Sequence, residues 1–169
     1  QILKFNRQGK FLLQIGHAGK SAGSNDTENF ASPTKATYYA KTNEVFVSDG
    51  YINRRVAVFD ADTGQYKRHW GAYGKRPDDA VKPTRSAGGP PPEQFNLVHD
   101  VQISNDDLVY VADRSNNRIQ VFNPDGTFVR MLDLTDHLRH GRAATWCLVM
   151  LTVTGLLAVG TGRLAAAWR

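Results

Sequence analysis

The chain has 169 residues, of which 41% are hydrophobic and 22% charged, and its formal net charge is +5. This composition suits one globular, turn-rich domain, favours the all-β class and excludes a disordered chain. A single cysteine, Cys147, excludes an intramolecular disulfide and a cysteine-based zinc cluster within one chain, and the scattered Lys and Arg residues argue against a nucleic-acid partner.

A repeated pattern runs through most of the chain. Residues 2–15, ILKFNRQGKFLLQI, match only the second half of the unit, so the chain begins inside an expected strand, and no signal peptide is visible. Residues 44–59, EVFVSDGYINRRVAVF, match residues 108–122, LVYVADRSNNRIQVF, with one residue inserted. Both full copies predict a strand, an Asp-containing turn and a second strand, followed by a turn and a further strand.

The apolar residues of these segments alternate in a way that indicates sheets covered on both faces. Val45 and Val47 fall on one face of an expected strand and Phe46 on the other. Long connections rich in Gly, Ser, Asn and Pro separate the units, at residues 16–29 and 75–93. Such connections commonly build binding sites.

The pattern V-x-D-x-x-x-N-R-[IV]-x-V-F, repeated with a glycine turn over roughly residues 1–132, resembles the NHL repeat family. That resemblance implies an all-β fold of four-stranded β-propeller blades, with about three blades in this chain. An open array would expose apolar faces and unpaired strand edges. We therefore expect a homo-oligomer, most simply a dimer that closes a six-bladed propeller.

Residues 133–169 form a divergent tail with a different composition, rich in Leu, Ala, Gly, Thr and Arg. The segment from Leu156 to Trp168 echoes the strands of the repeat and predicts a degenerate third blade. Two alternatives stay open, a membrane span over residues 143–162, which carry no charge, and a non-native extension. A membrane is a partner only if this tail spans it.

Within the NHL group, residues 47–51 and 53–54, together with residues 95–99 and 111–114, resemble the peptidyl-hydroxyglycine amidating lyases. Those enzymes are zinc-dependent propellers that release a peptide amide and glyoxylate. The resemblance places His99 at a zinc-binding histidine, Tyr51 at the catalytic tyrosine and Arg114 at a catalytic arginine. It also implies a small-molecule or peptide substrate and a secreted or periplasmic location.

These residue types suit the chemistry. Imidazole is a common zinc ligand, nearby positive charge favours a phenolate that acts as a base, and guanidinium grips a carboxylate in a bidentate manner. The set is incomplete, because Thr34 stands at the place equivalent to His99 in the preceding repeat. A second copy of His99 would supply another ligand in a closed dimer, with His17, His137 or His140 as supplements. We expect a divalent metal, with zinc favoured over calcium.

Other interpretations of the same residues remain. The metal site also suits a hydrolase of esters, lactones or phosphotriesters, and a propeller without catalysis would be a protein-interaction scaffold. In the structural alternative, His99 is a hydrogen-bonded strand residue and Arg114 pairs with Asp113 or Asp49. Arg54 and Arg118 are expected to be structural residues of the repeat.

Overall fold

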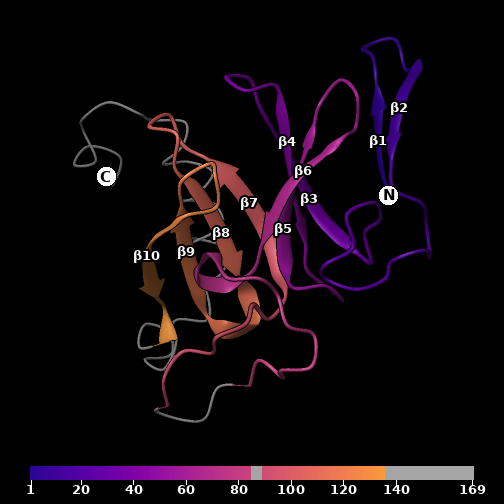
Figure 1. The fold of residues 1–169 in the computed structure, drawn as a ribbon. Helices are drawn as coiled ribbons and strands as arrows, with labels where there is room; N and C mark the ends of the chain where they lie inside the picture. The colour runs from indigo at the N-terminus through magenta and orange to yellow at the C-terminus, as the bar shows by residue number, and fades with distance from the viewer. Residues whose placement is uncertain (85–88, 136–169) are drawn as a thin grey trace, which may run out of the picture.

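A computed structural model describes residues 1–84 and 89–135, and its regular structure is antiparallel β-sheet apart from short 3-10 turns (Figure 1). In chain order the elements are β1 Ile2–Phe5, β2 Phe11–Ile15, β3 Pro33–Tyr39, β4 Glu44–Asp49, β5 Arg55–Asp60, β6 Tyr66–Trp70, η1 Ala72–Gly74, β7 Val98–Ile103, β8 Val109–Asp113, η2 Arg114–Asn116, β9 Arg118–Phe122 and β10 Phe128–Asp133.

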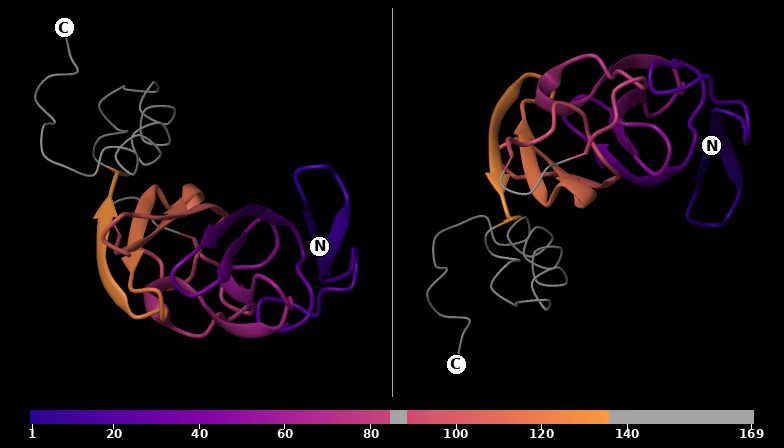
Figure 2. Two further views of the ribbon diagram at one scale, coloured as in Figure 1. Left: turned by 90° about the horizontal axis from the view of Figure 1, so that it is seen from above. Right: turned by 90° about the horizontal axis from the view of Figure 1, so that it is seen from below.

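The strands form two four-stranded sheets and one hairpin. The sheet orders are β3-β4-β5-β6 and β7-β8-β9-β10, and β1 pairs with β2 alone. Figure 2 shows the hairpin on one side of the first sheet and the second sheet on the other. The predicted all-β class and the propeller blades are therefore confirmed.

The hairpin β1–β2 is the outer half of a blade. In all three sheets an aromatic pair joins the two outer strands, with the rings meeting edge to face. The pairs and their centroid distances are Phe5–Phe11 at 5.9 Å, Phe59–Tyr66 at 5.8 Å and Phe122–Phe128 at 5.8 Å. The predicted match between the amino-terminal segment and the second half of the repeat is thus confirmed.

The middle blade is buried on both faces, as the alternation of its apolar residues predicts. One face, which includes Phe46 and Val58, packs into a core shared with the second blade. The other face, which includes Val47 and Phe59, packs against Ile15 of the hairpin. This double burial holds the three sheets side by side.

The tail lies almost entirely outside the described residues. The predicted third blade, the alternative membrane span and His137 and His140 all fall within residues 136–169, of which the structure describes nothing. Among residues 1–84 and 89–135, no helix is long and apolar enough to cross a membrane.

Two hydrogen bonds from Arg68 to the carbonyl of Pro124 connect the blades at the end of the sheets away from the long connections, and a salt bridge within the middle blade holds the Arg68 guanidinium. Arg68 of β6 grips both carboxylate oxygens of Glu44 at 2.7 Å and also donates to the carbonyl of Pro124, in the last turn of the second blade. The hydrogen bonds from Arg68 lower the pKa of Glu44 to about 2. Glu44 is therefore ionised throughout the neutral range.

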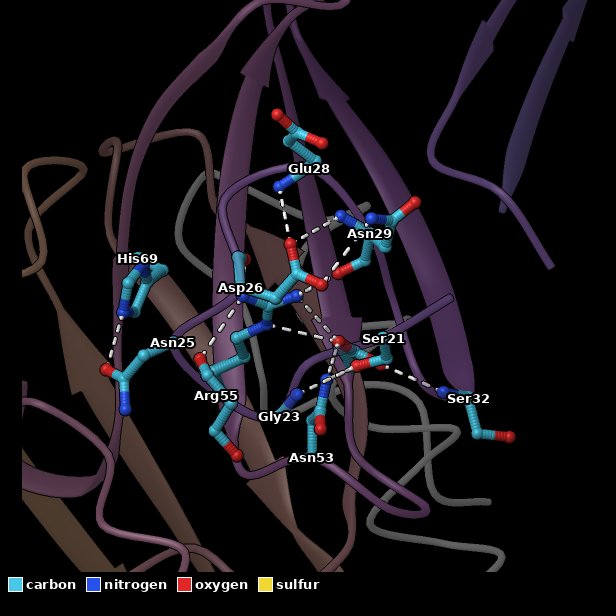
Figure 3. A network of polar contacts seen from close by, with 12 residues as sticks. Ser21, Gly23, Asn25, Asp26, Glu28, Asn29, Ser32, Asn53, Arg55 and His69 are labelled. Carbon is cyan, nitrogen blue, oxygen red and sulfur yellow. Dashed lines mark hydrogen bonds and ion pairs between the residues drawn. The ribbon is translucent and has the colours of Figure 1, made fainter. Parts of the chain in front are cut away.

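Each blade buries an aspartate–arginine pair where its middle strands meet the preceding connection. Asp49 pairs with Arg55 at 3.0 Å and Asp113 pairs with Arg118 at 2.6 Å, and all four side chains are 0% exposed. The arginines also donate to connection carbonyls, which for Arg55 include that of Asn29 (Figure 3). The pair thus ties each connection to its own blade.

An asparagine completes each pair. The Asn53 amide donates to Asp49 at 2.7 Å, and the Asn116 amide donates to Asp113 at 2.8 Å. The remaining carboxylate oxygen accepts a backbone N–H just before the inner strand, from Ser32 in one blade and from Asn96 in the other. We call each set of Asp, Asn and Arg the blade anchor.

The predicted match of Arg54 to Arg118 in the repeat was wrong, although Arg54 does make structural contacts. Arg55, not Arg54, is the counterpart of Arg118, because the inserted residue lies before Asn53 and leaves the spacing from asparagine to arginine unchanged. Arg54 is bound instead to the carbonyls of Asp78 and Val81 in the long connection. The structural role predicted for Arg118 is confirmed.

Replacing Arg118 with methionine should lower the free energy of unfolding by about 3–5 kcal/mol, because Asp113 would remain buried without its countercharge. Arg130→Met, an exposed change on β10, is the matched control and should cost under about 0.5 kcal/mol. Urea unfolding measures both variants. A loss in Arg118→Met no larger than in Arg130→Met would show that the anchor does not stabilise the blade.

Candidate functional site

The inner strand of each complete blade contains a β-bulge at an equivalent residue. In β7, Val98 pairs with Asp113 and Asp100 pairs with Ala112, which leaves His99 as the extra residue. In β3, the extra residue is Thr34. Because a bulge re-aims the side chain of the extra residue, it sets the direction of the His99 imidazole. The predicted equivalence of Thr34 and His99 is confirmed.

Tyr51 lies beside His99, although the two residues belong to different blades. Tyr51 follows β4, and its backbone N–H donates to the carbonyl of Ser32 at 3.4 Å. Its ring meets the His99 ring edge to face, with centroids 6.1 Å apart and planes at 70°. The Tyr51 side chain is 57% exposed, so the phenol is accessible to a substrate.

Gly50 permits this approach between the blades. A Cβ atom at residue 50 would lie 1.9 Å from the carbonyl oxygen of Val98 and 2.4 Å from its nitrogen. The turn before Tyr51 therefore rests directly on the backbone of the residue before His99. Any side chain at residue 50 would separate the turn from β7.

Arg114 starts η2, directly after β8, at the same end of the second blade as His99. Its backbone N–H donates to the carbonyl of Leu97 at 3.1 Å, and its side chain is exposed. Within the described residues, its guanidinium makes no hydrogen bond or ion pair. The structure thus places Arg114 at the same rim without joining it to the Tyr51–His99 pair.

The structural alternative for Arg114 is not what the structure shows. Asp49 and Asp113, the proposed partners of Arg114, are held by Arg55 and Arg118 in the blade anchors. The Arg114 guanidinium is therefore available to an anionic ligand.

The described residues do not complete a metal site around His99. Residues 1–84 and 89–135 contain no group of three or more His, Cys, Asp or Glu side chains that could hold a metal ion. Thr34, at the equivalent bulge, turns its hydroxyl to Ser48 and Val98. The described residues therefore contain no set of three ligands that includes His99.

Two features of the rim were missed in the sequence. In the sequence, Gly50 resembles any glycine in a turn, because no neighbouring residue indicates that β7 packs against it. The inner-strand bulges leave no pattern in a single strand, although the alignment of residues 30–34 with residues 95–99 pairs Thr34 with His99. That alignment was the available signal.

The second blade matches a family model. Residues 95–122 match the NHL repeat, and they include β7, β8 and β9.

Three relatives extend the match across most of the chain. The chain is 34% identical over 146 residues to the peptidylglycine alpha-amidating monooxygenase of Rattus norvegicus, covering 84% of this chain and 13% of that protein. It is 30% identical over 114 residues to a probable peptidyl-alpha-hydroxyglycine alpha-amidating lyase of Caenorhabditis elegans, covering 68% of this chain and 28% of that protein. It is 28% identical over 126 residues to NHL repeat-containing protein 3 of Mus musculus, covering 73% and 31%. The chain therefore spans less than a third of each of these relatives.

Gly50→Ala should lower the free energy of unfolding by about 3 kcal/mol or more, because the new methyl group overlaps the backbone of Val98. Gly19→Ala is the control, since residue 19 has a φ of +71° and nothing within 4 Å of an added Cβ. That variant should cost only about 1 kcal/mol of backbone strain. Denaturant unfolding compares the two, and equal losses would disprove the close approach at Gly50.

Proposed function

This chain is an NHL-repeat β-propeller protein related to amidating enzymes, and from that premise we propose that it is part of a lyase that cleaves peptidyl-α-hydroxyglycine. The observation that carries the proposal is the contact between Tyr51 and His99 across two blades. Two residues at positions that resemble catalytic and metal-binding positions of the lyases lie ring against ring, and Arg114 lies at the same rim.

Tyr51 is the proposed general base. In the cleavage, the substrate hydroxyl loses its proton to the phenolate, the carbonyl of glyoxylate forms, and the carbon–nitrogen bond breaks. The nitrogen keeps the bonding electrons and takes up a proton to give the peptide amide. An exposed phenol that packs on a neighbouring ring is accessible for the first of these proton transfers.

Arg114 is the proposed carboxylate clamp. Its side chain is exposed and unpaired within the described residues, while its backbone is fixed to Leu97. A guanidinium in that state can bind both oxygens of the substrate carboxylate. Because Leu97 stands two residues before His99, the clamp is tied to the strand that carries the imidazole.

His99 is the proposed protein ligand of a divalent metal, with zinc favoured and calcium as the alternative. A complete set of three ligands requires residues outside the described ones, since those offer no group of three. A site of this kind requires the ring to be closed.

Ring closure requires further strands. Two complete blades and one hairpin are fewer than the four to eight blades typical of propellers. A cavity of about 420 Å³ lies between the β1–β2 hairpin and the middle blade, where it is lined in part by Ala36, Tyr38 and Val45. We propose that further blades complete the ring, and a second copy of this chain is the simplest supplier. A secreted or periplasmic location stays a prediction.

The proposed roles predict distinct kinetic effects in the whole protein, assayed with an α-hydroxyglycyl peptide. Tyr51→Phe should lower kcat about 100-fold or more, because it removes the base. Arg114→Ala should raise KM about tenfold or more, because it removes a charged hydrogen-bond pair to the carboxylate. Tyr38→Phe and Arg130→Ala, two exposed changes elsewhere, are the controls. Variants of Tyr51 and Arg114 that behave like their controls would refute the assignment.

The proposed metal ligand has a test of its own. His99→Ala in the whole protein should abolish bound zinc or calcium, measured by elemental mass spectrometry after gel filtration, because the site loses a ligand. Tyr51→Phe should retain the metal, since it leaves the imidazole in place. Metal that survives in His99→Ala, or is absent from the unmodified protein, would exclude His99 as a ligand.

A further inference from the structure

Thr34 joins the inner strands of the two blades. Its hydroxyl oxygen lies 2.9 Å from the carbonyl oxygen of Val98 on β7. On β4 it lies 3.0 Å from the carbonyl oxygen of Ser48 and 2.7 Å from the Ser48 hydroxyl oxygen. Ser48 is fully buried. Since a carbonyl only accepts, the Ser48 hydroxyl can donate to Thr34 while Thr34 donates to the nearer of its two carbonyls, that of Val98. This chain of hydrogen bonds crosses the boundary between the blades.

Val98 is held on a second side by the turn that contains Gly50. The backbone of that turn approaches the carbonyl and the nitrogen of Val98 so closely that only glycine fits. Because the peptide group is planar and rigid, fixing the Val98 carbonyl also fixes the amide of His99. The Thr34 hydroxyl thus acts one peptide bond away from the imidazole.

The same strand provides an internal comparison. Thr37, three residues further along β3, donates to the carbonyl of Val101 at 2.6 Å. This bond has the same chemistry and joins the same two strands. It differs from the Thr34 bond in its place, because Val101 is separated from His99 while Val98 is adjacent to it.

We infer that Thr34 is a positioning residue that holds His99 against Tyr51. The inference rests on the proposed function for its catalytic meaning, since it concerns the same rim. In the first complete blade the bulge position supplies a hydroxyl that binds backbone, and in the next it supplies the imidazole. Thr34, at the bulge of β3, thereby orients the imidazole of His99, at the bulge of β7.

Thr34→Val removes the hydroxyl while keeping the branched shape, and Thr37→Val is the matched control. In the whole protein, NMR should show a nuclear Overhauser effect between the Tyr51 and His99 rings. Thr34→Val should lose that effect and lower turnover about tenfold, the order of one hydrogen bond. Thr37→Val should lose similar stability yet keep the ring contact, and Thr34→Ser should restore it. Equal behaviour of the two valine variants would overturn the inference.

A measurement on the unmodified protein covers the case in which Thr34→Val fails to fold. The Thr34 hydroxyl proton should exchange slowly with water and show a coupling through the hydrogen bond to the Val98 carbonyl carbon, because it is donated to Val98 rather than to the Ser48 carbonyl. A rapidly exchanging proton would overturn the inference without any variant. The ring contact and the exchange rate do not depend on turnover, so a protein inactive on α-hydroxyglycyl peptides would refute the proposed lyase and leave the positioning role standing.

Discussion

The buried pair of aspartate and arginine is the interaction on which the rest of the structure depends. A charge without solvent requires a partner and further hydrogen bonds, and each anchor supplies both. Asp113 receives Arg118, Asn116 and the backbone of Asn96, and Arg118 in turn donates to the carbonyl of Gln94. One ionic group thus fixes the turn after β8 and the chain that enters β7. Because Arg114 lies in that turn and His99 on that strand, the anchor also fixes the spacing of the rim.

The rim is built from two blades, and its geometry depends on how they pack. The Tyr51 turn belongs to one blade and His99 to the other, and only backbone separates them at Gly50 and Val98. The interface is held from both ends, by Thr34 and Thr37 along the inner strands and by Arg68 at the outer turn. A packed interface with several hydrogen bonds transmits displacement rather than absorbing it. Changes remote from Tyr51 should therefore affect the pair.

The β-bulge of the inner strand links the repeated structure of the blades to the candidate site. Repetition supplies both described inner strands, β3 and β7, with an extra residue at the same place, and a bulge aims that side chain differently from those of its neighbours. A hydroxyl at that place binds the adjacent blade, and an imidazole at that place faces a tyrosine. In these two blades the same position therefore holds a structural contact in one and a candidate catalytic residue in the other.

The repeat pattern by itself determined the all-β class, the blades and the half-blade formed by β1 and β2. Alternation and turn residues are local properties, so a single sequence displays them. The choice between Arg54 and Arg55 was decided by the structure, because an insertion of one residue can be placed on either side of Asn53. The contact of Tyr51 with His99 was also decided there. It depends on the close approach of two segments about 50 residues apart at Gly50, and no local pattern records the distance between two packed sheets.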